Sequence, residues 1–198
     1  MEAERLRAII KAQTDIASAD LDARGVMQLV AERACGITRA TAGVIEIPDG
    51  DEMVYVVTTG EATPYLGIRL KRDDSLSGLC LSQSDVLHCE DSESDPRVDH
   101  EACRRVHARS MICVPLRHRL SVVGVLKVYS PEPGRFDRQD IQTLEMLSDL
   151  VAAQIARADL YELEATQNRT DALTGLLNRR AYEERLAVEC ARAARSLN

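Results

Sequence analysis

The sequence predicts an α+β fold in which an antiparallel sheet is flanked by helices and followed by a long C-terminal helix. Two pairs of β-branched runs, each joined by a short turn, predict two hairpins. Segments with apolar residues at three- and four-residue spacing lie before and after these runs and predict amphipathic helices. Between the hairpins lies a long stretch of irregular pattern. Within a compact domain, such a stretch usually forms a lid or a pocket wall.

The chain begins with two predicted helices. Apolar residues recur at helical spacing over residues 2–19, which predicts an amphipathic helix. Asp20 and Asp22 are favourable residues for starting a second helix, and Gly36 lies near its end. The apolar positions of the second helix are Val26, Leu29, Val30, Ala34 and Ile37.

The first hairpin is predicted from two β-branched runs, Thr41–Ile47 and Glu52–Thr59. They flank the tetrapeptide Pro48-Asp49-Gly50-Asp51, whose residue types all favour turns. Residues 67–70 predict a short third strand.

The irregular stretch is Lys71–Arg109, where short apolar pieces alternate with the polar run Glu90–Asp99. The clearest hairpin follows it, with strands at Ser110–Leu116 and Ser121–Ser130. This order of elements predicts a layered fold with helices on one face of the sheet and a variable loop region on the other. The loop-covered face is the expected place for a small ligand.

The C-terminal helix is predicted from Asp137, a capping residue, to Glu164. Its core-facing positions are Ile141, Leu144, Leu147, Val151 and Ile155. Beyond them, Ala158, Tyr161 and Ala165 form a thinner seam, which is typical of a parallel coiled coil. We therefore expect a homodimer through the N- and C-terminal helices.

Composition excludes several classes of function. The net charge of −7 and the aromatic content of 3% argue against a nucleic-acid partner, which needs basic and stacking groups. No run of eighteen apolar residues and no signal-like segment occurs, so we expect a cytoplasmic protein without a membrane partner. The six cysteines form no CxxC pair, and the four histidines lack ligand spacing, so no metal site is expected.

Residues 22–158 resemble a GAF domain, a sensor relative of the PAS fold. The resemblance rests on the first hairpin, on Asp91–Leu116, and most specifically on Val122–Ala156. In this last stretch a glycine follows two β-branched residues, and a strand and a Phe-Asp helix start precede a final helix rich in Leu and Ala. The resemblance implies an antiparallel sheet with a small-molecule pocket and a C-terminal signalling helix.

A second resemblance lies further along the chain, at residues 170–198. The residues that match the DxLTGLxNRR opening of GGDEF domains are Asp171, Leu173, Thr174, Gly175, Leu176, Asn178, Arg179 and Arg180. GGDEF domains are diguanylate cyclases, which condense two GTP molecules into cyclic di-GMP across a dimer. The segments that bind Mg²⁺ and GTP would lie after Asn198, so no catalytic residue is expected in this chain and its 198 residues should have no cyclase activity.

The resemblances divide the chain into an N-terminal dimerisation helix (1–21), a GAF sensor (22–158), a coiled-coil linker helix (159–169) and the truncated start of a GGDEF domain (170–198). They imply the regulatory sensor of a diguanylate cyclase that responds to an unknown small ligand. Mg²⁺ and GTP are expected only for the missing catalytic part.

Cysteines and charged residues of the irregular stretch are the candidate pocket residues. They are Cys80, Cys89, Asp91, Asp95, Arg97, Cys103, His107, Arg109 and Cys113. Two simpler interpretations compete: the cysteines are buried core residues, and Asp95-Pro96-Arg97 forms a turn with an ion pair. A reactive Cys103 would need a nearby cation, which Arg104, Arg105, His107 or Arg109 could supply.

Three more specific pockets are alternatives. Free methionine-sulfoxide reductases are GAF domains that use cysteines in this region, and Cys80 and Cys103 lie roughly where theirs would, without an evident acidic substrate-binding pattern. Bilin-binding GAF domains attach their chromophore through a Cys followed by His, whereas Arg104 follows Cys103. A pocket for a cyclic nucleotide or another small ligand stays open.

Overall fold

The computed structural model describes residues 7, 10, 11, 14, 23–118, 121–149 and 151. All of them belong to the first of two units, Met1–Ala156. Most of the predicted N-terminal helix, the linker 159–169 and the segment 170–198 lie outside the described residues. No helix in the described part is long and apolar enough to span a membrane.

A six-stranded antiparallel sheet with the order β3-β2-β1-β6-β5-β4 forms the centre of the domain. Its strands are β1 (Ala42–Asp49), β2 (Glu52–Gly60), β3 (Arg69–Lys71), β4 (Leu87–Cys89), β5 (Ser110–His118) and β6 (Ser121–Ser130). Both predicted hairpins and the short third strand are confirmed.

The first hairpin has the tight turn that its sequence predicts. Asp49 pairs with Glu52, so two residues form the loop. Gly50 has φ +61°, which a two-residue hairpin turn requires and which glycine adopts without strain. A register shift between Ile45 and Glu46 follows in the same pair of strands. This bulge lies beside the buried charges described below.

The stretch between the hairpins contains more regular structure than predicted. Besides β4, it includes α3 (Leu76–Gln83) and α4 (His100–Arg105). The N-caps are local: Ser75 Oγ accepts from the Gly78 amide at 3.0 Å, and an Asp99 carboxylate oxygen accepts from the Ala102 amide at 2.9 Å. A Cβ at Gly78 would lie 1.8 Å from the Arg72 carbonyl oxygen, so only glycine permits this close approach.

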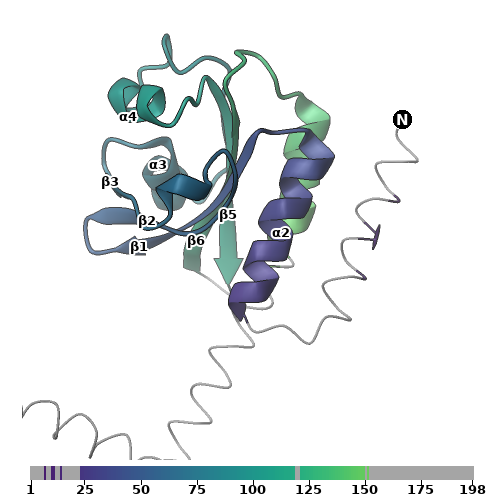
Figure 1. Cartoon of the computed structure of the whole chain (residues 1–198). Coiled ribbons are helices and arrows are strands. Elements are labelled where there is room, and N and C mark those ends of the chain that lie inside the picture. The colour runs from purple at the N-terminus through teal and green to yellow at the C-terminus, as the bar shows by residue number, and fades with distance from the viewer. Residues whose placement is uncertain are drawn as a thin grey trace, which may run out of the picture. The chain divides into compact units, whose positions relative to one another are not determined.

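One face of the sheet is covered by α2 (Ala23–Thr38) and by the helix that begins at residue 138 (Figure 1). Asp137 caps this second helix by accepting from the Asp140 amide at 2.9 Å, as predicted. The hydrophobic core on this face includes Val26, Val30, Ala34, Ile45, Ile112, Val114, Leu126, Val128, Phe136, Leu144, Leu147 and Val151. We call it the helix face.

The opposite face is covered by α3, α4, the short 3-10 helix η1 (Thr63–Tyr65) and the loops that join them (Figure 1). Its buried residues come from alternate positions of the same strands, because successive side chains of a strand point to opposite sides. They include Val44, Met53, Tyr55, Cys80, Cys89, Cys103, Met111, Cys113 and Tyr129. We call it the cavity face, and it is the loop-covered face that the sequence predicts.

The loop 90–99 is tied to the ends of neighbouring elements. Ser92 Oγ donates to the Ala108 carbonyl at 2.8 Å, just before β5. The Gly134 amide donates to the Glu90 carbonyl at 2.7 Å, in the segment between β6 and the C-terminal helix. This loop therefore links the cavity face to the start of the helix on the other face.

Candidate functional site

A small cavity lies between the sheet and the helices of the cavity face. Its volume is about 30 Å³. Its lining comes from Tyr55, Leu70, Ser75, Leu76, Ser77, Val98, Asp99, Ala102, Cys103, Val106, Ala108, Met111 and Lys127. The walls are mostly apolar, and the polar groups of Tyr55, Ser77 and Lys127 lie together at one end.

A buried ion pair joins β1 and β6 beside this cavity. Lys127 Nζ lies 2.6 Å from Glu46 Oε1, and their side chains are 7% and 0% exposed. The two strands are antiparallel neighbours, in which Val44 pairs with Lys127 and Glu46 with Val125. The two charged residues are therefore diagonal neighbours on the same side of the sheet.

Further hydrogen bonds connect the ion pair to β2 and α3. Lys127 Nζ donates to Tyr55 Oη at 2.7 Å, and Ser77 Oγ donates to Glu46 Oε1 at 2.7 Å. Ser77 Oγ also lies 3.7 Å from Cys113 Sγ. Burying a charge costs several kcal/mol unless it is paired and hydrogen-bonded. These contacts offset that cost, and they fix the ammonium group at the end of the cavity.

The pKa shifts show which protonation states this cluster holds near neutral pH. Burial is the largest single effect on Lys127 and lowers its pKa, but the charge and hydrogen bond of Glu46, together with Tyr55 and Cys113, raise that pKa well above its ordinary value. Burial raises the pKa of Tyr55 to about 12, against the opposing charge of Lys127. Lys127 is therefore an ammonium ion, and Tyr55 keeps its hydroxyl proton.

Among the described residues, two buried side-chain oxygen atoms on this face lack a hydrogen-bond partner. They are Glu46 Oε2 and the hydroxyl oxygen of Tyr129. Most buried polar atoms in proteins are paired, so such atoms usually indicate an ordered water or a ligand group. Neither Glu46 nor Tyr129 belongs to the cavity lining itself.

The candidate cysteines are distributed around the cavity, and Cys103 is the one that lines it. Cys80, Cys89 and Cys113 are buried in the surrounding core, and all four thiols are free. Burial raises the pKa of Cys89 and Cys113 to about 12 and raises the pKa of Cys80 and Cys103 as well. These thiols therefore match the buried-core interpretation better than that of an activated nucleophile.

The candidate Asp95 and Arg97 form the turn and ion pair weighed as the simpler interpretation. Arg97 donates to both carboxylate oxygens of Asp95, at 2.9 and 2.6 Å. It also donates to the His88 carbonyl at 2.8 Å. The Arg97 guanidinium lowers the pKa of Asp95 to about 2. Neither residue lines the cavity, and the pair braces the loop that carries Val98 and Asp99.

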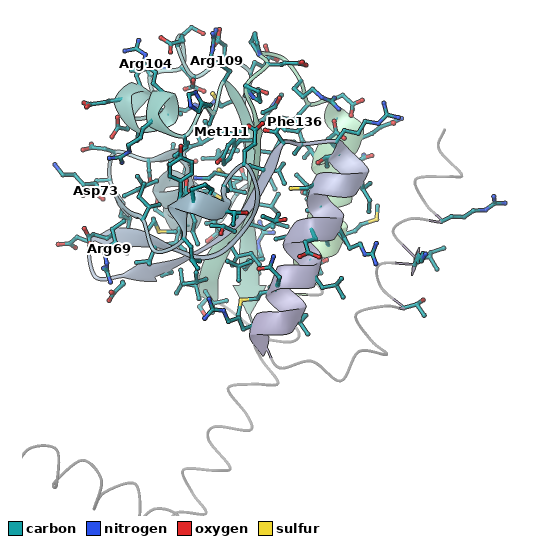
Figure 2. All side chains as sticks on the ribbon, viewed as in Figure 1. Arg69, Asp73, Arg104, Arg109, Met111 and Phe136 are labelled. Atoms are coloured by element: carbon teal, nitrogen blue, oxygen red, sulfur yellow. The ribbon has the colours of Figure 1, made fainter. Side chains whose placement is uncertain are left out.

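The candidates Asp91 and Arg109 also pair with each other, through two hydrogen bonds of 2.9 and 2.7 Å. Arg104 is paired with Glu93, 2.9 Å from its Nε. Figure 2 shows Arg104 and Arg109 at the outer side of the domain, beyond the buried Met111. With His107, these two arginines line a separate hollow, and none of the three lines the cavity.

A wider groove opens next to the cavity. Its volume is about 580 Å³, and it shares Val98 and Asp99 with the cavity lining. Its other residues are Asp73, Asp74, Leu79, Pro96, Arg97, His100 and Glu101. Among the described residues, no group of three or more His, Cys, Asp or Glu side chains is arranged to hold a metal ion.

The polar end of the cavity, formed by Tyr55, Ser77 and Lys127, and the neighbouring Glu46 were not predicted as site residues from the sequence. Glu46 and Lys127 are single charges inside runs of β-branched and aliphatic residues. In half-buried strands such charges usually point to solvent, so each looks ordinary alone. The sequence signal that could have indicated this ion pair is the opposite charges of Glu46 and Lys127 on two predicted strands that could pair.

Comparison with known proteins identifies the fold. Residues 20–156 match the family described as GAF domain. The chain belongs to the GAF domain family. The matched residues end before the segment 170–198, so the match does not include the GGDEF-like motif.

Solved GAF domains agree with this assignment. The GAF domain of a phosphoenolpyruvate-protein phosphotransferase from Coxiella burnetii is 21% identical, with a TM-score of 0.72, over 80% of this chain and 96% of that one. The free methionine-R-sulfoxide reductase of Neisseria meningitidis, solved with its substrate, is 18% identical, with a TM-score of 0.70, over 80% of this chain and 92% of that one. At these identities the likeness concerns the fold.

A curated relative is larger than this chain. The protein named probable 3′,5′-cyclic phosphodiesterase of Caenorhabditis elegans is 25% identical over 124 residues. These residues are 61% of this chain and 16% of the relative. The shared part is thus a small fraction of that protein.

Proposed function

We propose that this GAF domain is the regulatory sensor of a diguanylate cyclase, in which a small ligand controls the synthesis of cyclic di-GMP from two GTP molecules. The observation that carries the proposal is the motif Thr170–Arg180, which follows the GAF domain and resembles the opening of a GGDEF domain. The motif lies outside the described residues, so the proposal rests on its sequence.

The arrangement of the sheet supports a sensor role. Met111 and Lys127 line the cavity, while their strand neighbours Ile112, Leu126 and Val128 belong to the core under the helices. A ligand that shifts β5 or β6 would therefore change the packing under the C-terminal helix. Packed cores respond to such shifts by moving between discrete arrangements.

The proposed output is a change in the geometry of a homodimer. Cyclase chemistry needs two GTP-loaded domains to face each other, and paired signalling helices can set their distance without touching substrate. Met146, on the helix that begins at residue 138, is 45% exposed, which leaves an apolar group available to a second copy. In this proposal the protein acts in the cytoplasm.

The test is a cyclase assay on the protein expressed from the whole reading frame that contains these 198 residues. Purified protein is supplied with GTP and Mg²⁺, and cyclic di-GMP is measured with and without residues 20–156. We expect cyclase activity that changes when the GAF domain is removed. A reading frame that encodes no GGDEF domain would contradict the proposal. So would a rate of cyclic di-GMP synthesis that is the same with and without residues 20–156.

The alternative, a methionine-sulfoxide reductase, has one observation in its favour: Cys103 lines the cavity, in a fold shared with such an enzyme. The raised pKa of Cys103 opposes it, because burial disfavours the thiolate that attacks a sulfoxide. Measuring free methionine-sulfoxide reduction by wild type and Cys103→Ser separates the two functions. Turnover lost on substitution would support the enzyme.

A further inference from the structure

Two hydrogen-bond donors at the cavity have no acceptor among the described residues. An ammonium group has three N–H bonds. Two of those of Lys127 are directed to Glu46 and to Tyr55. The third has no hydrogen-bond acceptor among the described residues, although the ammonium group also lies 4.6 Å from the centroid of the Tyr55 ring. Tyr55 Oη accepts from Lys127, and its own proton has no acceptor in the described part of the chain. Both groups line the cavity, and their donor atoms are 2.7 Å apart.

The local charge favours an uncharged acceptor. Glu46 neutralises Lys127 at 2.6 Å, and Ser77 stabilises the same carboxylate oxygen. An anion placed beside Lys127 would add a net negative charge near buried Glu46, and a cation would oppose the ammonium group. A neutral oxygen can accept from both donors without an unbalanced buried charge.

The rest of the cavity favours apolar atoms. The lining side chains away from Lys127 are mostly hydrocarbon or sulfur, and they include Leu70, Leu76, Val98, Ala102, Cys103, Val106, Ala108 and Met111. Nothing in that wall satisfies a second polar group except Asp99 and Ser75, and both cap helices through their side chains. A suitable ligand therefore has one polar end and an apolar body.

The cavity must widen to accept such a ligand. Its volume of about 30 Å³ suits a water molecule. The groove of about 580 Å³ adjoins it at Val98 and Asp99 and gives a route of access. The helix α4 closes the cavity, and Tyr65 Oη holds its last turn by donating to the Arg105 carbonyl at 2.9 Å. Outward movement of this six-residue helix would enlarge the cavity.

The groove also selects against anions. Carboxylates at Asp73, Asp74, Asp99 and Glu101 line it, and the charge of Arg97 is compensated by Asp95. We propose that the GAF cavity binds an uncharged, largely apolar small molecule whose single carbonyl-type oxygen accepts hydrogen bonds from Lys127 and Tyr55. The inference rests on the proposed sensor function, and it names the ligand class of that site.

The experiment compares four probes of similar shape on the full 198-residue chain. Cyclopentanone has a neutral acceptor, methylenecyclopentane replaces the oxygen by a CH₂ group, and cyclopentanecarboxylate and cyclopentylammonium are charged. Binding is followed by NMR at the methyl groups of Met111, Ala102 and Ala108. We expect the ketone to bind at least about tenfold more tightly than methylenecyclopentane, because its oxygen accepts hydrogen bonds from both Lys127 and Tyr55. Both ions should bind at least about tenfold more weakly than the ketone.

Two hydroxyl deletions provide matched variants. Tyr55→Phe removes a donor at the cavity, and it should reduce the preference for ketone over methylenecyclopentane by roughly fivefold. Tyr129→Phe removes another buried hydroxyl on the same face, outside the cavity lining, and should leave that preference unchanged. The measured quantity is the ratio of the affinities for two probes. A general loss of protein stability would lower both affinities and leave this ratio unchanged.

Three results would overturn the inference: the carboxylate binds more tightly than the ketone, Tyr55→Phe and Tyr129→Phe act alike, or no probe shifts the cavity methyl groups. The last result would mean that the cavity holds water alone. These measurements do not involve GTP, so their failure is distinct from failure of the cyclase assay. If the GAF domain regulates cyclase activity but binds none of the four probes, the proposed function stands and the proposed ligand class is wrong.

Discussion

The two faces of the sheet are made from alternate residues of the same strands, and they differ in chemistry. On the helix face, Ile112, Leu126 and Val128 are buried by helices and contribute only hydrocarbon. On the cavity face, Met111 and Lys127 line a cavity beside a buried ion pair. Hydrocarbon burial stabilises the fold directly. Buried charges are costly, and removing one partner of a buried ion pair leaves the other charge uncompensated. In our proposal the helix face holds the structure together and the cavity face binds the ligand.

The largest expected effect comes from breaking the charge balance of the cavity face. Lys127→Met leaves Glu46 buried without its partner and should lower the free energy of unfolding by about 3–5 kcal/mol. Urea denaturation at neutral pH measures the change. The double variant Glu46→Gln/Lys127→Met removes both charges and should recover most of the loss. If the double variant were no more stable than the single one, lost packing rather than unpaired charge would be the cause.

A purely apolar loss on the helix face should be somewhat smaller. Leu144 is fully buried, so Leu144→Ala leaves a cavity and should lower the free energy of unfolding by about 3 kcal/mol. Met146 lies on the same helix and is 45% exposed, so Met146→Ala should change it by less than about 0.5 kcal/mol. Equal effects of these two substitutions in denaturation would argue against the described orientation of this helix.

The smallest effect concerns the loop that borders the cavity. Asp95→Asn weakens the ion pair with Arg97 and should lower the free energy of unfolding by about 1 kcal/mol near neutral pH. Arg97 lowers the pKa of Asp95 to about 2 in the folded protein. The stabilisation is therefore complete above the ordinary Asp value of about 4 and is lost as the pH falls toward about 2.

The difference between wild type and Asp95→Asn should accordingly narrow below about pH 4. Urea midpoints of both proteins, measured from about pH 6 downward, test this. A difference that stays constant with pH would show that the loss is not electrostatic.

The elements that sequence analysis predicted well depend on local signals. The turn at Gly50, the cap at Asp137 and the Asp95–Arg97 ion pair each involve residues close together in the chain. The helices α3 and α4 were missed because they are short and have little periodicity of their own. Their caps and their packing on the sheet stabilise them. The capping residues can be recognised in the sequence, whereas the packing on the sheet cannot.

The candidate site was predicted less completely, for a topological reason. The irregular stretch does supply much of the cavity wall, including Cys103. The ion pair beside the polar end joins Glu46 and Lys127, which meet because β1 and β6 are neighbours in the sheet. The order of strands in a sheet is not a local property, so the opposite charges of these two residues did not by themselves identify them as partners.

The hydrogen bond from the Gly134 amide to the Glu90 carbonyl gives this domain an internal reporter. Glu90 begins the loop that ends at the cavity wall, and Gly134 precedes the helix that starts at residue 138. A hydrogen-bonded amide exchanges its proton with solvent when the bond opens. The exchange rate at Gly134 therefore measures how often the cavity wall separates from the beginning of that helix, before any ligand has been identified.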